Sequence, residues 1–171
     1  PLWLVSIYLV MVLFAPFTIY MHKKYPYATV LSLITVTVLI DNIDFSLSFS
    51  YLKLFNYLFF WIVIHQIGYF FADGKIQKVN LNVFRYITVF TYGYLFYQMS
   101  VSESYLSLAS YRLTSLNNED PPTTMYLIAS IGLICLFLSL KNIIENILAN
   151  QKIWLLISHI HSNIYTIYLW H

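Results

Sequence analysis

The stretch Leu2–Met21, LWLVSIYLVMVLFAPFTIYM, contains no charged residue over twenty positions. An α-helix of about 20 residues is about 30 Å long, which matches the hydrocarbon thickness of a bilayer. We therefore expect a membrane-spanning helix here, with Pro16 as a kink within it. His22, Lys23 and Lys24 follow directly and predict that this helix ends at a membrane boundary.

The composition of the whole chain agrees with this first run. Hydrophobic residues make up 60% of the 171 residues and charged residues only 9%, whereas a soluble domain has about 25% charged residues. Only four glycines and five prolines interrupt the apolar runs, which lack the alternation of transmembrane β-strands. The sequence therefore predicts an all-α, polytopic membrane helix bundle.

Six apolar runs are candidates for membrane-spanning helices. They are Leu2–Met21, Ala28–Ile43, Leu54–Phe71, Val83–Met99, Met125–Leu140 and Ile153–His171. Because no repeat or linker divides them, we expect a single membrane domain over residues 1–171. The chain begins at Pro1 without an initiator Met and stops directly after an apolar run, so we expect a fragment that lacks N-terminal helices and a C-terminal end.

The basic residues predict how these runs are oriented. If the runs alternate across the bilayer, seven basic residues fall on one side and only Lys53 and Arg112 on the other. The seven are Lys23, Lys24, Lys75, Lys78, Arg85, Lys141 and Lys152. Because loops rich in Lys and Arg stay in the cytoplasm, we expect the group of seven to face it.

Charge and cysteine usage exclude several other classes of site. The net charge of +2 is spread among separate loops, so we expect no nucleic-acid partner. Cys135 is the only cysteine, which excludes an internal disulfide and a cysteine metal cluster. His159 and His161 are two residues apart, and this spacing on a helix points the rings in different directions. We therefore expect no metal site.

His65 and Gln66 are polar side chains in the middle of an apolar run. Ionisable residues are costly in lipid and often mark a substrate pathway. The same side chains could instead hydrogen-bond to a neighbouring helix, with Gly68 allowing that helix to approach closely. The sequence leaves both roles open, helix packing or the wall of a substrate cavity.

Four polar residues share one face of the last run. At about 100° per residue, His161, Tyr165, Tyr168 and His171 fall within a sector of roughly 120°. A polar stripe in an apolar helix faces either neighbouring helices or a wet cavity. These four residues are therefore further candidates for lining a substrate cavity.

Polar side chains also mark the predicted outer ends of the helices. Asp41, Asp44, Asn117 and Asp120 could bind the hydroxyl groups of a polar substrate at an outer mouth. The alternative is that they simply mark a solvated membrane boundary. The pair Pro121–Pro122 predicts a rigid start for the helix that follows.

Three segments, in order along nearly the whole chain, resemble the membrane acyltransferase family 3, particularly its bacterial members. The matching residues are Leu2-Trp3 and Ala15-Pro16 in the first run, Trp61, His65-Gln66-Ile67-Gly68-Tyr69 and Asp73-Gly74-Lys75 in the third, and Pro121-Pro122-Thr123 with Tyr168-Leu169-Trp170-His171 toward the end.

This resemblance implies a multi-pass enzyme of the bacterial cytoplasmic membrane. Such enzymes move an acyl group, commonly acetyl, from a coenzyme A thioester to a sugar hydroxyl of a cell-surface or secreted molecule. Their chemistry is attributed to an Arg and a His of the first helix, the His acting as base, and both would precede Pro1. The partners implied are the lipid bilayer, acyl-coenzyme A as donor substrate and a carbohydrate acceptor, with no bound cofactor.

Two alternatives from other classes stay open. A transporter or flippase segment would use His65, Gln66 and the stripe of the last run as a polar pathway, although a proton-coupled pathway usually needs an intramembrane carboxylate. A degenerate, non-catalytic homologue would agree with Val5-Ser6-Ile7, where the resemblance leads us to expect an Arg. The sequence specifies neither the acceptor sugar, the acyl chain nor the oligomeric state.

Overall fold

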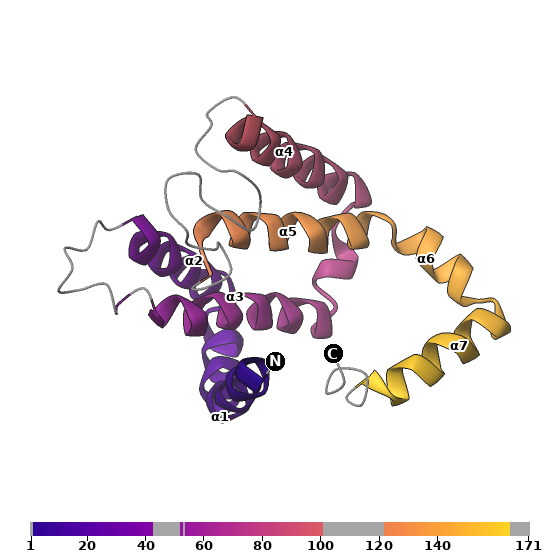
Figure 1. Cartoon of the computed structure of the whole chain (residues 1–171), viewed down its shortest axis with the longest axis horizontal. Helices are drawn as coiled ribbons and strands as arrows, with labels where there is room; N and C mark the ends of the chain where they lie inside the picture. The colour runs from indigo at the N-terminus through magenta and orange to yellow at the C-terminus, as the bar shows by residue number, and fades with distance from the viewer. Residues whose placement is uncertain (1, 43–51, 53, 101–121, 165–171) are drawn as a thin grey trace.

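The computed structural model describes residues 2–42, 52, 54–100 and 122–164 (Figure 1). The regular elements of this part are all helical. They are α1 (Leu2–Lys24), α2 (Pro26–Asn42), α3 (Phe55–Ala72), the 3-10 turn η2 (Ile76–Lys78), α4 (Leu81–Ser100), α5 (Thr124–Ser139), α6 (Lys141–Leu148) and α7 (Gln151–Ser162). The expected all-α class is confirmed.

Two of these helices are long and apolar enough to cross a membrane. They are α1, over Val5–Lys24, and α3, over Phe55–Ala72. The apolar α5 is followed by α6 at a bend of 60°, and a third span is reached only if this bent pair counts as one. The described part of the chain therefore has two or three candidate spans, fewer than the six that the sequence led us to expect.

The lower number has a physical cause in the remaining helices. The 17 residues of α2 and the 16 residues of α5 correspond to about 26 Å and 24 Å at 1.5 Å per residue, less than the roughly 30 Å of a bilayer core. The 20 residues of α4 are long enough, but Asn82, Arg85 and Gln98 make this helix less apolar. The 12 residues of α7 are shorter still.

The core of the molecule is centred on α3. Phe60 and Val63 of α3 are buried against Leu127 of α5. The ring of Phe60 stacks on that of Tyr126 with 5.3 Å between centroids. Because α1 and α2 also pack against α3, this helix connects them to α5.

Successive helices from α1 to α5 run in alternating directions. The chain reverses at Tyr25, and Pro26 is the first residue of α2, a position where its missing N–H costs no helical hydrogen bond. At the far end of α2, the Thr37 carbonyl accepts a hydrogen bond from Asn56 near the start of α3, at 3.4 Å. The start of α4 and the end of α5 line one pocket, so these two helices are also antiparallel.

This alternation gathers helix ends that carry basic residues. A hydrogen bond joins the last turn of α1 to the residue after α3, and one pocket joins the end of α3, the start of α4 and the end of α5. We call this part of the molecule the basic end, defined by Lys23, Lys75, Arg85 and Lys141. These four residues belong to the group that the charge asymmetry predicted on one side of a membrane.

Large apolar side chains are exposed along α1 and α4. Examples are Leu13 and Phe17 on α1 and Phe90 and Phe96 on α4. Soluble monomers rarely expose continuous apolar surface of this extent. Such surfaces are stable when lipid covers them, and together with the two long apolar helices they identify the chain as a membrane protein.

The packing of α4 on α5 depends on Gly132. A Cβ atom at this position would lie 2.6 Å from Cγ2 of Thr91, too close for any real carbon pair. Small residues allow membrane helices to approach in this way. The same role was expected for Gly68, but a Cβ atom there would meet no atom within 4 Å among the described residues.

We predict that Gly132→Ala lowers the free energy of unfolding by about 1–3 kcal/mol, because the added methyl group overpacks the contact with Thr91. Thermal unfolding in detergent micelles measures this change. Thr91→Ser removes Cγ2 and should recover part of the loss in the double variant. The matched control is Gly93→Ala on α4, where a Cβ atom meets open space; an equal loss in this control would contradict the packing account.

Candidate functional site

A chain of hydrogen bonds joins α1 to α3 at the basic end. Nδ1 of His22 lies 3.0 Å from Oε1 of Gln66, and Nε2 of the same ring lies 3.1 Å from Oδ2 of Asp73. Nε2 of Gln66 donates to the carbonyl oxygen of Thr18 at 3.0 Å. Nζ of Lys75 donates to Oδ2 of Asp73 at 2.8 Å. We call these five residues the α1–α3 lock.

The spacing of these residues in the sequence places them face to face. Thr18 and His22 are four residues apart on α1, which puts both side chains on one side of that helix. Gln66, Tyr69 and Asp73 follow one face of α3 and its C-terminal cap. The Thr18 hydroxyl and the Tyr69 hydroxyl also form a hydrogen bond of 3.1 Å. Two residues of α1 therefore meet three residues of α3 and its cap.

The centre of the lock is buried. His22 is 3% exposed and Gln66 is fully buried. The imidazole ring packs against Tyr69 and Phe70, with ring centroids 5.4 Å and 4.8 Å away. Buried polar groups are costly unless they are hydrogen-bonded, and here both ring nitrogens and both amide atoms have partners. The lock therefore holds the two helices without leaving an unpaired group.

Both ring nitrogens of His22 lie against oxygen atoms of the lock. The Gln66 amide donates its NH₂ group to the Thr18 carbonyl, which leaves Oε1, an acceptor, facing Nδ1. The other ring nitrogen faces the Asp73 carboxylate, which is also an acceptor when ionised. Each ring nitrogen of His22 therefore faces an oxygen atom that accepts hydrogen bonds.

Asp73 lies beyond the end of α3 and is 44% exposed. The hydrogen bond from Lys75 is the largest cause that holds the pKa of this carboxyl below its ordinary value, and the hydrogen bond from His22 is the second. A hydrogen bond to the charged form of a carboxyl favours ionisation. The carboxylate is therefore the stable form in the lock at neutral pH.

A groove of about 370 Å³ lies between α1 and α3, on the side of the lock toward the N-terminus of each helix. The residues that line it are Ile7, Tyr8, Met11, Val12 and Ala15 of α1 and Trp61, Ile64 and His65 of α3. Its surface is mostly apolar, with Trp61 and His65 one helical turn apart on the α3 wall. The residues that line the groove suit an apolar group that carries one polar function.

His65 and Trp61 have unused hydrogen-bonding capacity. Nδ1 of His65 and Nε1 of Trp61 are buried and have no hydrogen-bond partner among the described residues. The His65 ring also contacts the aromatic ring of Tyr69, at 4.6 Å between centroids. Unpaired polar atoms in a buried position cost about 1–3 kcal/mol each.

The structure assigns different positions to the two neighbours that the sequence singled out together. His65 lines the groove, whereas Gln66 points into the α1–α3 lock and is fully buried there. His161 lies exposed on α7, a helix that packs against α6, so it does not line the groove with His65. The candidates Tyr165, Tyr168, His171, Asp44, Asn117 and Asp120 lie outside the described residues.

Asp41 occupies a defined place at the opposite end of the molecule. Its Oδ2 atom accepts a hydrogen bond of 2.8 Å from the backbone N–H of Thr124, the first residue of α5. The Thr123 hydroxyl accepts a second one from the N–H of Tyr126. The first N–H groups of a helix have no partner within the helix, and the helix dipole favours a negative charge there. Asp41 thus joins the end of α2 to the start of α5.

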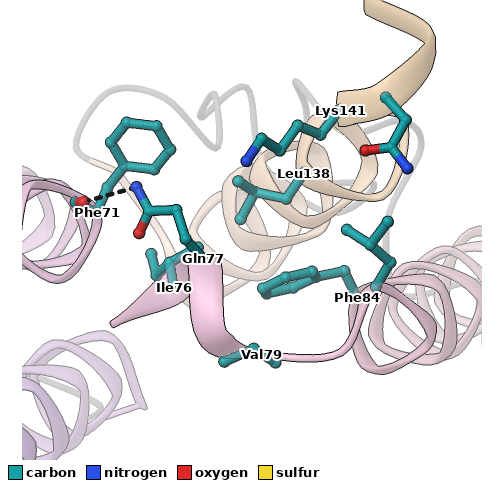
Figure 2. Close-up of a pocket in the computed structure, with 9 residues that line it drawn as sticks. Phe71, Ile76, Gln77, Val79, Phe84, Leu138 and Lys141 are labelled. Carbon is teal, nitrogen blue, oxygen red and sulfur yellow. Dashed lines mark hydrogen bonds between the residues drawn. The ribbon is translucent and has the colours of Figure 1, made fainter. Parts of the chain in front are cut away.

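A second, smaller pocket of about 170 Å³ lies at the basic end (Figure 2). Gln77 on η2 and Lys141 at the start of α6 supply polar groups, and Phe84 and Leu138 supply apolar walls. Figure 2 shows the Lys141 side chain extending past Leu138 toward the wall of the pocket that contains Gln77. Gln77 is held by a hydrogen bond of 2.9 Å to the Phe71 carbonyl oxygen.

In the described part of the chain, no group of three or more His, Cys, Asp or Glu side chains comes together in a way that could hold a metal ion.

His22 was not among the residues that the sequence singled out, since it stands at the head of a basic cluster that marks a helix end. The signal that could have identified it is its spacing of four residues from Thr18, together with the polar residues Gln66 and Asp73 at the end of α3.

No protein-family model, curated protein or solved structure matches the chain.

We predict that His22→Ala lowers the free energy of unfolding by about 1–3 kcal/mol, because it leaves Oε1 of the buried Gln66 without a partner. Thermal or denaturant unfolding in micelles measures the change. His159→Ala on α7 is the matched control, since His159 is exposed, and it should change stability by less than about 0.5 kcal/mol. Equal effects of the two variants would show that the lock does not hold the helices.

We also predict that stability decreases at low pH through Asp73. Because the pKa of Asp73 is lowered in the folded protein, its contribution is present above the ordinary carboxyl value of about 3.9 and is lost as the pH falls below it. Unfolding temperatures measured between neutral and acidic pH should therefore converge for the natural protein and Asp73→Asn. A constant difference between them across this range would contradict the prediction. Glu145→Gln, outside the lock, should keep the natural pH dependence.

Proposed function

We propose that this chain forms part of an integral membrane acyltransferase. The enzyme transfers an acyl group, most simply acetyl, from a coenzyme A thioester to a carbohydrate hydroxyl of a cell-surface or secreted molecule. The support from the sequence is the ordered resemblance to membrane acyltransferase family 3. We further propose that all six apolar runs are embedded in the bacterial cytoplasmic membrane, with the basic end in the cytoplasm, where loops rich in Lys and Arg remain.

The single observation that carries this proposal is the groove between α1 and α3. It combines apolar walls with His65 and Trp61, whose buried nitrogens have no partner among the described residues. An acyl group bound here would bury its hydrocarbon part against Met11 and Ile64. The polar atoms of the thioester or of the acceptor hydroxyl would lie near His65.

His65 has the role of a positioning residue in this proposal. The resemblance attributes the base to a His in an earlier helix of the family, so His65 is not needed for proton transfer. Holding a reacting group in place lowers the barrier because the entropy of alignment is lost on binding rather than in the transition state. The hydrogen bonds from His22 to Asp73 and Gln66 do not touch a bound group. They fix α1 against α3 and thereby set the width of the groove.

We predict that His65→Ala lowers acyl transfer by about tenfold, the value of one lost hydrogen bond of about 1.4 kcal/mol. The measurement uses the full-length protein in membrane vesicles, radiolabelled acetyl-coenzyme A and cell-envelope carbohydrate as acceptor. The change should appear in kcat/KM.

The control for this experiment is His159→Ala, which removes an exposed imidazole from α7 and leaves the groove intact. Transfer that is unchanged in His65→Ala, at normal expression, would reduce His65 to a packing residue. The absence of any transfer by the natural full-length protein would overturn the acyltransferase proposal itself.

A further inference from the structure

The short helix α6 has an apolar face and a polar face. At about 100° per residue, its four apolar residues fall within one sector of about 140°. Its four polar residues fall within a second sector on the opposite side of the helix. The apolar residues are Ile143, Ile144, Ile147 and Leu148, and the polar residues are Lys141, Asn142, Glu145 and Asn146. The polar face also carries an ion pair between Lys141 and Glu145, at 3.6 Å. This division is typical of a helix that lies at the boundary between lipid and water.

The apolar face of α6 is only partly covered by the rest of the described structure, with Ile144 and Leu148 half-buried. Ile143 is 57% exposed and Ile147 is 49% exposed. Figure 1 shows that α6 and α7, drawn in orange to yellow, extend away from the other helices. α6 packs only on its neighbours in the chain, α5 and α7, among the closely packed pairs of described elements. Its apolar face is therefore open to whatever surrounds the molecule.

The exposed apolar surface of α6 continues that of α5. Leu133, Phe137 and Leu140 are exposed along one side of α5 and the residue after it, and Ile143 and Ile147 follow on α6. The 60° bend at Leu140–Lys141 turns this continuous apolar surface away from the axis of α5. Lipid that covers α5 would thus also reach the isoleucines of α6.

The bend lies at the basic end of the molecule. Lys141 lines a pocket with Gln77 of η2 and Phe84 near the start of α4 (Figure 2). Charged and amide side chains at this level are stable in the headgroup region of a bilayer, where both water and lipid phosphates are available. The residues at the start of α6 therefore suit the headgroup region, where an in-plane helix is stable.

We infer that α6 lies in the plane of the membrane interface, with Ile143 and Ile147 inserted among the lipid chains and Glu145 facing water. The occupant of its apolar face is the bilayer that also surrounds α5. The geometry gives α5 a fixed end: the chain leaves the membrane core at Leu140 and runs along its surface to Leu148.

The competing arrangement treats α5 and α6 as one broken span. In that case Asn142, Glu145 and Asn146 would enter the hydrocarbon core. Polar and charged side chains are costly there unless they pair within the protein, and Glu145 pairs only with the exposed Lys141 on the same helix among the described residues. The in-plane orientation leaves all of them in water.

Spin labels on α6 test this orientation directly. Single cysteines replace Ile143, Ile147, Asn142 or Glu145 in a Cys135→Ser background, and the protein is reconstituted into vesicles of phosphatidylcholine and phosphatidylglycerol. Accessibility to oxygen reports lipid, and accessibility to a water-soluble nickel chelate reports water. We expect labels at Ile143 and Ile147 to lie about 5–10 Å below the headgroups and labels at Asn142 and Glu145 to be reached by the chelate.

Three other outcomes would overturn the inference. Access of the chelate to all four labels would place α6 in water. Preference of all four for oxygen would make α6 part of a broken span. Protection of Ile143 and Ile147 from both reagents would indicate a covering protein segment instead of lipid. If the Cys135→Ser protein does not fold, the same labels are introduced with Cys135 retained, because that thiol is buried and reacts more slowly than an exposed one.

Discussion

The hydrogen bonds of His22 are the interaction that fixes how α1 lies against α3. Apolar surfaces do not drive helices together within lipid, because lipid tails are as apolar as leucine. Buried polar groups do so, since each must find a partner in the protein. His22 reaches Gln66 on one side and Asp73 on the other, and therefore allows one register of α1 on α3. The same register places Ala15 opposite His65 and so creates the groove between them.

A second polar contact fixes the opposite end of the bundle. Asp41 joins α2 to the first backbone N–H of α5, and the apolar cluster of Phe60, Val63 and Leu127 lies between the two ends. Each end therefore uses a carboxylate next to a helix terminus, with an apolar core in the middle. Specific packing is added where a small residue permits it, as Gly132 does against Thr91. Polar contacts therefore determine which helices pack together, and the sizes of the side chains between them determine how closely the helices approach.

The positions of α1 to α5 could be predicted from the apolar runs, whereas α6 lies between two of the predicted runs. The common location of Lys23, Lys75 and Lys141 followed from alternation. The number of spans could not. Composition shows that α5 is apolar, but its 16 residues and the bend after it depend on packing. In the site, sequence spacing identified His65 as polar within an apolar run but could not separate its role from that of Gln66. Side chains one residue apart on a helix point about 100° apart, and only the position of α1 decides which of them is buried.

The same argument explains why His22 was missed and why it matters. A histidine beside two lysines at the end of an apolar run is typical of a solvated boundary, and nothing local distinguishes it from Lys23 or Lys24. Its partners are 44 and 51 residues away, so its burial is a property of the fold rather than of the run. Because Asp73 also binds Lys75 in the turn after α3, the lock connects the buried register of two helices to a partly exposed carboxylate at the membrane boundary.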